Sequence, residues 1–416
     1  MKKIQKVLSV VFALAIFLGA KNCSHAFSAK LENKVNLGKN SFLADMAVYK
    51  GKLYYTDAII SGQEKDENGN LYGGNCDVKV YEKDIKTGKK TLINSYGTYN
   101  LIGLQISFKV LNDGNLYMMY HIGGGVMGSD FVFGLTGVNK GKNILTYNYG
   151  NMEFDNDGKS VIITPTGPWD NGNVIRNMTG KVYSLTKEGE FPGKYFIEDM
   201  TGKNAAIRYA SKYSTLRGNT LYLKKISGVE DKLNQYDLTA LDLDTGAESK
   251  LAECISTIGM GENEIYFIRD LPMVNELVQP KKMLYKYDFE SQKTTLISQE
   301  NNPYYEILPI GDKVFFTGSD GFYTDDAKLN LFMANSDGSE TKKLCSNFKR
   351  VVSDGEKLAV LYSDGKGSNI QFLDACGKVL GKISLPQTQV DMFMAGDEFI
   401  AWSWQSGYAY YYKIDK

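Results

Sequence analysis

The sequence predicts an all-β protein folded as a single closed β-propeller, with eight four-stranded blades. Three observations predict it. One turn-and-strand unit recurs along nearly the whole chain. The composition, with 28 tyrosines, 42 glycines and 8 prolines in 416 residues, suits short strands joined by tight turns. The last unit lacks an outer strand, which the beginning of the chain could supply.

The clearest copy of the repeated unit spans Gly311 to Leu344. A glycine turn precedes Lys313 to Thr317, whose β-branched and aromatic residues are typical of a strand. A polar loop follows, then a second strand from Leu329 to Ala334, a turn from Asn335 to Ser339 and a third short strand. Three strands and two turns, with room for a fourth strand before the next copy, match one propeller blade.

The opening turn and strand of this unit occur eight times. Their glycines are Gly51, Gly114, Gly158, Gly218, Gly261, Gly311, Gly355 and Gly396. The average spacing is about 49 residues, which is within the range of propeller blades. Glycine allows the positive φ that tight hairpin turns require. Seven blades remain the alternative if the looser second or third unit is not a true blade.

The two ends of the chain predict how the ring closes. The eighth unit ends with strands around Phe399 to Trp402 and Tyr410 to Ile414, and its outer strand is missing. The stretch from Lys34 to Leu37 is a strand candidate that precedes the first complete unit. If it completes the last blade, the ring has no unsatisfied blade edge at the closure.

The N-terminus has the pattern of an export signal. Lysines at the start precede the apolar run from Val7 to Ala20, which is shorter than the roughly 20 residues of a membrane span. Ser24-His25-Ala26 is a small-x-small cleavage site, so we assign residues 1–26 to a signal peptide and residues 27–416 to the propeller. Cys23 follows Lys21-Asn22, which fits a lipoprotein signal badly. We expect a secreted or cell-envelope protein.

The charge balance restricts the class of partner. Lys and Arg total 48, as do Asp and Glu, so nothing predicts a nucleic-acid surface or a polybasic membrane patch. No later segment is apolar enough to span a membrane, and we expect a monomer. Four cysteines remain after cleavage, Cys76, Cys254, Cys345 and Cys376, without a C-x-x-C motif. Export permits disulfides between them, and small apolar strand residues are the alternative.

Particular motifs resemble a known group of propellers. Leu53-Tyr54-Tyr55-Thr56-Asp57 is similar to the Tyr-Trp-Thr-Asp signature of low-density-lipoprotein-receptor-type propellers, and Val314 to Thr317 and Asn335 to Ser339 look like the same group. The organisation also resembles, more distantly, TolB-like propellers. The resemblance covers nearly the whole mature chain, although only the first unit carries the Thr-Asp pair. It implies a binding or interaction platform and no defined reaction.

Most catalytic constellations are absent from the sequence. His121 is the single histidine after the signal, and no Gly-x-Ser-x-Gly elbow accompanies it. The glycines after His121 lack the Lys-Ser/Thr of a phosphate loop, and one histidine excludes a histidine-rich metal site. No cofactor is expected. A carboxylate pair for hydrolysis needs only proximity in space and stays open.

Acid-rich turns leave metal binding undecided. Asp155-Asn156-Asp157-Gly158 and Asp242 to Gly246 are similar to calcium loops, but both occur where hairpin turns are expected. The long polar loop from Ile60 to Asp77 gives Asp66 and Asn68 a chance of binding a cation.

The connections between second and third strands predict where a ligand binds. They vary in length and open on one face with the inter-blade loops, and variable loops on a rigid scaffold are the usual place for recognition. Trp169, between prolines and glycines, is expected to be exposed and to stack on a ligand, or else to cap a blade core. The further candidates near the ends of second strands are Asp57, His121, Arg269, Tyr323 and Trp404.

The sequence therefore predicts an exported, non-catalytic propeller that binds a protein or peptide at the cell surface. Tyrosine- and asparagine-rich loops also suit sugars, so an extracellular glycan is the second choice. The competing class is a hydrolase that uses carboxylates on the loop-rich face. An enzyme is the minority interpretation.

Overall fold

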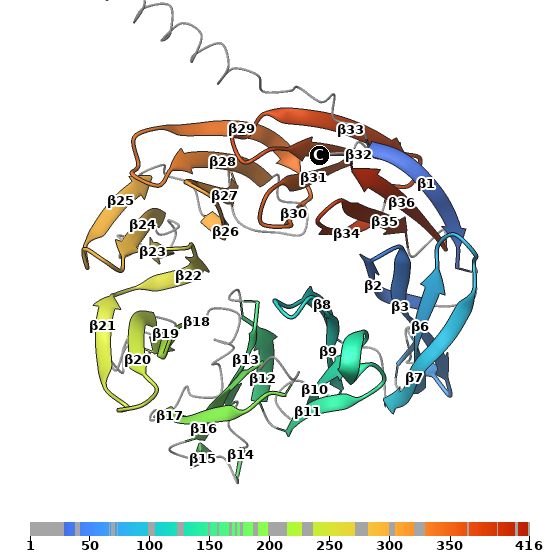
Figure 1. Ribbon diagram of the computed structural model, residues 1–416, viewed down its shortest axis with the longest axis horizontal. Coiled ribbons are helices and arrows are strands. Elements are labelled where there is room, and N and C mark those ends of the chain that lie inside the picture. Colours follow the sequence, from blue (N-terminus) through green and yellow to red (C-terminus); the bar gives the residue numbers. More distant parts are fainter. Residues whose placement is uncertain are drawn as a thin grey trace, which may run out of the picture.

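The computed structural model is a ring of eight four-stranded antiparallel sheets around a central axis (Figure 1). It describes residues 29–37, 42–65, 67, 71–72, 74–98, 105–122, 129–148, 150–155, 158–165, 169–170, 173–174, 178–185, 190–198, 214–226, 236–270, 282–298, 304–319, 329–363, 366–388, 390–403 and 407–414. The predicted signal peptide, Tyr323 and Trp404 lie outside these residues.

The strands of the first four blades follow one another in the chain. Blade 1 contains β2 (Phe42–Tyr49), β3 (Lys52–Ser61), β6 (Asn75–Asp84) and β7 (Lys90–Thr98). Blade 2 contains β8 (Gln105–Val110), β9 (Leu116–Ile122), β10 (Ser129–Gly134) and β11 (Asn143–Asn148). Blade 3 contains β12 (Gly150–Phe154), β13 (Ser160–Pro165), β16 (Met178–Ser184) and β17 (Gly193–Glu198). Blade 4 contains β18 (Thr215–Arg217), β19 (Thr220–Ile226), β20 (Tyr236–Asp242) and β21 (Glu248–Ala252).

The remaining blades repeat this order until the last one. Blade 5 contains β22 (Ile255–Met260), β23 (Glu264–Asp270), β24 (Lys282–Asp288) and β25 (Thr294–Ser298). Blade 6 contains β26 (Tyr304–Ile310), β27 (Lys313–Ser319), β28 (Leu329–Asn335) and β29 (Thr341–Phe348). Blade 7 contains β30 (Arg350–Ser353), β31 (Leu358–Ser363), β32 (Ser368–Leu373) and β33 (Val379–Leu385). Blade 8 contains β34 (Asp391–Ala395), β35 (Glu398–Ser403), β36 (Tyr408–Ile414) and β1 (Ala29–Asn36).

Three small elements complete the described structure. They are the ribbons β4 (Glu64–Lys65) with β5 (Leu71–Tyr72) and β14 (Trp169–Asp170) with β15 (Asn173–Val174), and the 3-10 turn η2 (Gly137–Asn139). The second and third repeats of the sequence are complete blades. The prediction of eight blades is confirmed, and the seven-blade alternative is excluded.

Seven of the eight turn glycines have the positive φ that the repeat predicts, and Gly261 does not. Gly51 joins β2 to β3 at φ +71°, and Gly396 joins β34 to β35 at φ +61°. A Cβ atom at either position would meet no neighbouring atom within 4 Å. Backbone conformation rather than space therefore favours glycine there, because L-residues rarely adopt positive φ.

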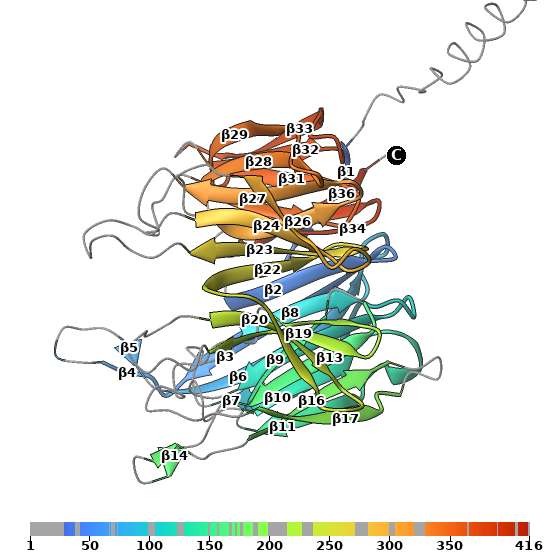
Figure 2. The same cartoon turned by 90° about the vertical axis from the view of Figure 1, so that its left-hand side faces the viewer.

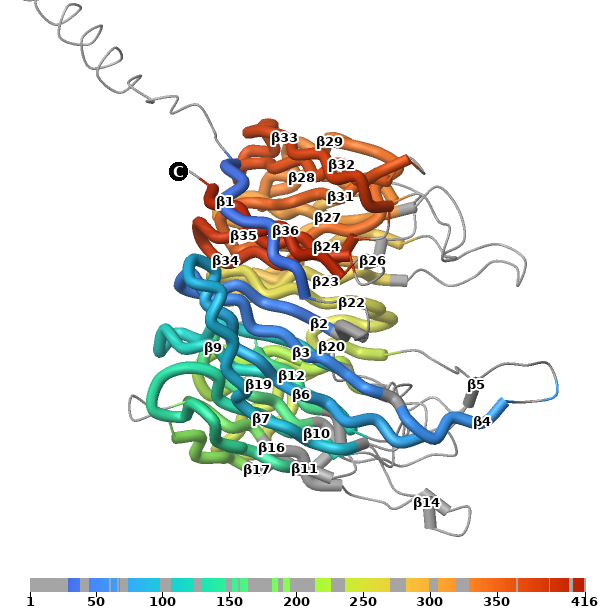
Figure 3. The backbone as a smooth tube through the Cα atoms, turned by 90° about the vertical axis from the view of Figure 1, so that its right-hand side faces the viewer, coloured from blue at the N-terminus to red at the C-terminus, as the bar shows by residue number. Residues whose placement is uncertain are grey.

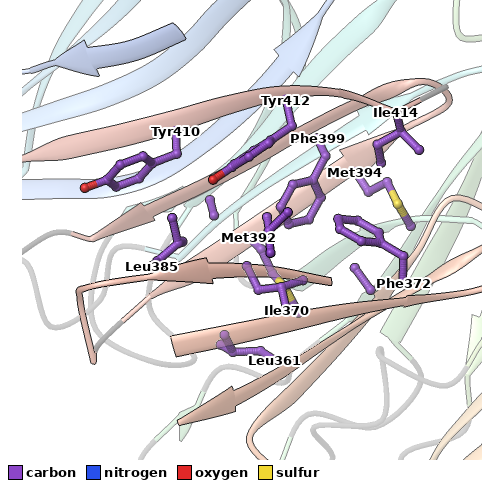
Figure 4. Packing of buried hydrophobic residues seen from close by; sticks show 13 residues of the cluster. Leu361, Ile370, Phe372, Leu385, Met392, Met394, Phe399, Tyr410, Tyr412 and Ile414 are labelled. Atoms are coloured by element: carbon purple, nitrogen blue, oxygen red, sulfur yellow. The ribbon is translucent and has the colours of Figure 1, made fainter. Parts of the chain in front are cut away.

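The hydrophobic core lies in the seams between blades. Nine clusters of buried side chains occur in the described residues, and eight of them join two neighbouring blades. Between blades 7 and 8, Ile370 and Phe372 pack against Met392 and Phe399 (Figure 4). Since each sheet is covered on both faces, its second strand is apolar at successive positions rather than at alternate ones.

Adjacent aromatic residues in the second strands show how one strand fills two seams. Tyr55 belongs to the cluster shared with blade 8, and Tyr54 to the cluster shared with blade 2. Phe316 packs toward blade 5 and Phe315 toward blade 7 in the same way. Successive side chains of a strand point to opposite faces, so an aromatic pair contributes to both neighbouring seams. This arrangement accounts for the repeated apolar pair after each turn glycine.

The N-terminal strand closes the ring, as predicted. β1 pairs antiparallel with β36, with Lys34 opposite Tyr410 and Val35 opposite Ala409. The strand begins at Ala29 rather than at Lys34, because its polar N-terminal half continues the same ladder to Ile414. Backbone pairing there does not require apolar side chains. The polar and charged residues before Lys34 therefore gave no strand pattern from which the beginning of β1 could be predicted.

Candidate functional site

The two faces of the ring differ in their connections. Turns between first and second strands and between third and fourth strands lie on one face, which we call the turn face. The connections between second and third strands lie on the opposite, loop-rich face. Two of them carry the β4–β5 and β14–β15 ribbons, which stand off the same face (Figure 2). The view from the opposite side shows β4 standing off that same face (Figure 3).

The acid-rich turns on the turn face are closed by their own side chains. Asp242 Oδ1 accepts hydrogen bonds from the N–H and the hydroxyl of Thr245, at 2.7 and 2.9 Å. Asp84 accepts the same two bonds from Thr87. These aspartates therefore cap turns. Within the described residues no group of three or more potential metal ligands occurs, and Asp66 and Asn68 lie outside them.

The predicted site residues are distributed over several blades. Asp57, His121 and Arg269 lie on the second strands of blades 1, 2 and 5, so the ring does not gather them into one pocket. Trp169 is part of β14 and pairs with Val174, which corrects the expectation that this stretch is poor strand material. The connection folds onto itself as a ribbon and satisfies backbone groups locally. The Trp169 side chain lies outside the described residues.

His121 and Asp130 form a cross-strand pair near the loop-rich face. They are opposite each other in β9 and β10, and His121 Nδ1 lies 3.0 Å from Asp130 Oδ1. Asp130 is buried, and His121 is partly buried. A buried carboxylate beside an imidazole fixes the orientation of the ring. His121 is therefore held by its own blade.

Asp57 and Arg269 are half-buried strand residues. Asp57 pairs across the sheet with Leu43 and Lys79, and β3 continues beyond it to Ser61. The Asp57 charge acts on Lys90, whose pKa is lowered by burial and raised again by that carboxylate. Arg269 lies one residue before the end of β23, as predicted.

The inner strands enclose a cavity that the sequence did not predict. Its volume is about 1040 Å³, and it is lined by inner-strand and turn residues of blades 1, 2, 5, 6, 7 and 8. Gly51, Gly355 and Gly396 place it at the turn face, and Arg350 marks its extent toward the opposite end of the channel. A second cavity of about 620 Å³ lies among blades 3 to 6 and shares Met260 and Pro309 with the first. Together they form the central channel.

Four charged residues occupy corresponding positions near the beginnings of successive inner strands. They are Glu306, Arg350, Asp391 and Asp45, in blades 6, 7, 8 and 1. An inner strand begins where the inter-blade connection ends, so this charged arc lies at the loop-rich end of the channel. Arg350 forms an ion pair with Asp391 across the seam between blades 7 and 8.

The backbone around two of these carboxylates is irregular in the same way. β2 shifts register between Leu43 and Met46, and β26 shifts between Tyr304 and Ile307. At each bulge the N–H of the acidic residue donates to a threonine hydroxyl of the next strand. The distance is 3.3 Å from Asp45 to Thr56 and 3.1 Å from Glu306 to Thr317. Bulges commonly re-aim a side chain, and here they position two acids.

Burial and charge alter the acidity of both carboxyl groups. The pKa of Asp45 is raised to about 7: burial is the main cause, the Asp391 carboxylate adds to it, and the hydrogen bond from the Met46 N–H and the charge of Arg350 oppose it. Burial also raises the pKa of Glu306, which Arg350 lowers in part. Glu306 keeps solvent contact, whereas Asp45 is half-buried. Asp45 is therefore the group of the arc whose ionisation is most disfavoured.

Sequence reasoning missed this arc although a signal existed. Thr317 was interpreted as a strand residue and Thr56 as part of a family signature. The acidic residues Asp45 and Glu306 precede the turn glycines Gly51 and Gly311 by six and five positions. Only the closed ring places blade 1 beside blade 8, so the chain order alone did not bring Asp45 to Asp391.

Comparison with known proteins assigns the fold. No known family profile matches this sequence, and no curated protein sequence matches it. The propeller domain of the trilobed protease from Pyrococcus furiosus is 13% identical, with a TM-score of 0.51 over 84% of this chain and 97% of that domain. That domain is described as having an open velcro topology, whereas here β1 pairs with β36.

Two peptidases are also similar to this chain in fold, at low sequence identity. An acylaminoacyl peptidase from Pyrococcus horikoshii is 12% identical, with a TM-score of 0.51 over 88% of this chain and 59% of the peptidase. A prolyl endopeptidase is 11% identical, with a TM-score of 0.52 over 88% of this chain and 55% of that enzyme. The chain thus spans less than two thirds of either peptidase. Such distant likeness establishes a β-propeller and assigns no activity.

The described residues include no helix long and apolar enough to cross a membrane. The four cysteines among these residues, Cys76, Cys254, Cys345 and Cys376, form no disulfide with one another. Of the two alternatives for these cysteines, the structure therefore has strand and turn residues rather than disulfides.

Proposed function

We propose that this chain is an exported, non-catalytic propeller that binds a protein or peptide partner through its loop-rich face. The observation that carries the proposal is the asymmetry of the two faces. Short, self-capped turns such as the one closed by Asp84 lie on the turn face, and the β4–β5 and β14–β15 ribbons project from the other. Rigid scaffolds commonly present recognition surfaces on such connections.

The sequence supports the chemistry of the proposed binding face and the cellular location of the protein. Trp169 in β14, Tyr323 in its predicted loop and Trp404 near the predicted end of a second strand supply aromatic area with polar groups, which suits peptide recognition. The similarity of Leu53 to Asp57 to the Tyr-Trp-Thr-Asp signature supports an interaction platform related to receptor-type propellers. The N-terminal pattern of residues 1–26 supports export to the cell envelope or beyond.

The test separates the two faces of one blade. Replacing residues 62–74 by Asn-Gly removes the β4–β5 ribbon and leaves Ser61 and Asn75 joined by a two-residue turn that suits a hairpin. The matched control changes exposed turn-face residues of the same blade, Lys86→Ala with Lys89→Ala. Trp169→Ala tests the second ribbon. Recovery of proteins from the native cell surface is then compared quantitatively between these variants and the wild type.

A partner that is retained by the wild type and the control, and lost by the ribbon variants, supports the proposal. Equal recovery by all variants would contradict it. Retention abolished by periodate oxidation of the surface extract would instead favour a glycan ligand. Cleavage products of surface molecules that appear with the wild type and not with the ribbon variants would favour a hydrolase. Export is checked separately by the mature N-terminus, which is expected at Phe27.

A further inference from the structure

Two aspartates occupy matching positions at the seam between blades 8 and 1. Asp45 Oδ1 accepts a hydrogen bond from the N–H of Met46 at 2.8 Å, and Asp391 Oδ1 accepts one from the N–H of Met392 at the same distance. Both residues lie on inner strands, and β2 packs against β34. The two carboxyl groups are therefore fixed on either side of the seam by their own backbone.

The guanidinium of Arg350 interacts with both aspartates. Arg350, at the beginning of β30, forms an ion pair with Asp391, and its charge also acts on Asp45. If both aspartates are ionised, two anions share one cation in a partly buried place. Because Asp391 has the direct contact with Arg350, the repulsion between the two anions mainly disfavours the ionised form of Asp45.

Among the described residues, the other strands with the main contacts to β2 provide no comparable partner for Asp45. These strands are β3, β8 and β35. At the bulge, β3 supplies the uncharged hydroxyl of Thr56. The charged residues of these strands are Lys52 and Asp57 of β3, Lys109 of β8 and Glu398 of β35. Glu398 contacts Gly51, at the opposite end of β2. The charges that act on Asp45 are those of Asp391 and Arg350.

We propose that Asp45 and the Arg350–Asp391 ion pair form a proton-dependent clasp at the loop-rich end of the central channel. With Asp45 protonated, the three groups are together neutral, and β2 and β34 pack closely. When Asp45 ionises, it and Asp391 repel each other across the seam, and the inner strands of blades 8 and 1 loosen. The seam concerned is the one that joins the last blade of the ring to the first.

The first experiment follows the ionisation itself. Carboxyl carbon resonances of the full chain, labelled at aspartate, are titrated by NMR, and the Asp45 signal is assigned by its loss in Asp45→Asn. The wild-type midpoint is expected near a pH of about 7, because burial and Asp391 outweigh the opposing effects of the Met46 N–H and Arg350 on the pKa of Asp45. Asp391→Asn should lower it by about one pH unit, because an adjacent anion is removed. Asp312→Asn, at an exposed carboxyl group, should leave it unchanged.

The second experiment follows the seam. Amide hydrogen exchange of β2 and β34, corrected for the intrinsic pH dependence, is compared at pH 6 and pH 8. Wild-type protection should fall by about tenfold at pH 8, the factor that corresponds to one pKa unit. Asp45→Asn should abolish the difference, and β13 of blade 3 should show none in either protein.

A midpoint for Asp45 below about 5, in the range of ordinary aspartates, would overturn the proposal. So would an equal loss of protection in Asp45→Asn and the wild type. If Asp45→Asn does not fold, Asp391→Asn carries both tests, since it removes the repulsion and leaves Asp45 in place.

Discussion

Glu398 of blade 8 accepts a hydrogen bond at 2.7 Å from the backbone N–H of Gly51, which lies 347 positions earlier in the chain. The same Oε1 atom accepts a bond from the hydroxyl of Tyr411 at 2.8 Å. Gly51 forms the turn between β2 and β3 of blade 1, and its N–H donates to blade 8. A buried carboxylate thus joins the last blade to the first, beside the cluster that contains Trp402.

Glu398→Ala should destabilise the protein by about 1–3 kcal/mol, the cost of leaving buried donors unsatisfied. The donors are the N–H of Gly51 and the hydroxyl of Tyr411. Urea unfolding monitored by tryptophan fluorescence measures the change. Asp397→Asn is the control, because Asp397 is the exposed neighbour that pairs with Lys413. An equal effect of both substitutions would contradict a specific inter-blade role for Glu398.

Trp402→Ala should cost roughly 3–5 kcal/mol, the range for removing a large buried aromatic side chain. Trp402 is 2% exposed and packs in the seam between blades 8 and 1. Leu92→Ala is the control on an outer strand, where the side chain is 52% exposed. A shift in the unfolding midpoint for Leu92→Ala as large as that for Trp402→Ala would show that seam burial does not dominate stability.

Removing residues 29–36 should both destabilise the ring and cause self-association. The deletion leaves the edge of β36 unpaired, and its Tyr408 to Ile414 segment is rich in tyrosine. Unpaired strand edges recruit other strands. Analytical ultracentrifugation should detect oligomers, and a synthetic peptide of residues 29–36 should reverse them. Lys30→Ala is the control, since this side chain is exposed. A monomeric truncated protein with unchanged stability would exclude a closing role for β1.

Asp45→Asn should reduce the pH dependence of stability. The pKa of Asp45 is about 7 in the fold against an ordinary 3.8, so the folded chain binds more protons than the unfolded chain between these values. Its contribution is complete below about pH 4 and is lost as the pH rises through about 7. Because the pKa rises from 3.8 to about 7, the unfolding free energy lost over this pH range is at most about 4 kcal/mol.

The difference between wild type and Asp45→Asn isolates this contribution. Asp84 and Asp242, whose pKa values are lowered by turn hydrogen bonds from Thr87 and Thr245, give the opposite slope in both proteins. Between pH 4.5 and pH 8.5, the unfolding free energy of Asp45→Asn should increase relative to that of the wild type as the pH rises. A constant difference across that range would mean that Asp45 does not bind a proton in the folded state.

Local sequence predicted the blades because each blade, except the last, is built from strands that follow one another in the chain. The glycines at Gly51 and Gly396 require positive φ, and the aromatic pair Tyr54-Tyr55 fits a strand covered on both faces. Both signals act over a few residues. The outer strand of blade 8 was also predicted, though its beginning at Ala29 was not, because backbone pairing tolerates the polar residues of β1.

The candidate site was predicted less well. Second-strand positions such as His121 and Arg269 were located correctly on their strands, but they belong to separate blades, and His121 is held by Asp130. Strand periodicity gives the position of a residue along a blade. It does not say which residues of other blades approach it, since that depends on the number of blades and on the closure of the ring.

The sequence by itself predicted the strand units, their turns and the strand that closes the ring, because hairpins and alternating burial are encoded over short distances. The structure decided between eight blades and seven. Only the tertiary structure brought Asp45 beside Asp391 and Gly51 beside Glu398. These pairs form where the first and last blades meet, and contacts between residues more than three hundred positions apart have no local pattern. The charged arc at the channel end is therefore a property of the closed ring.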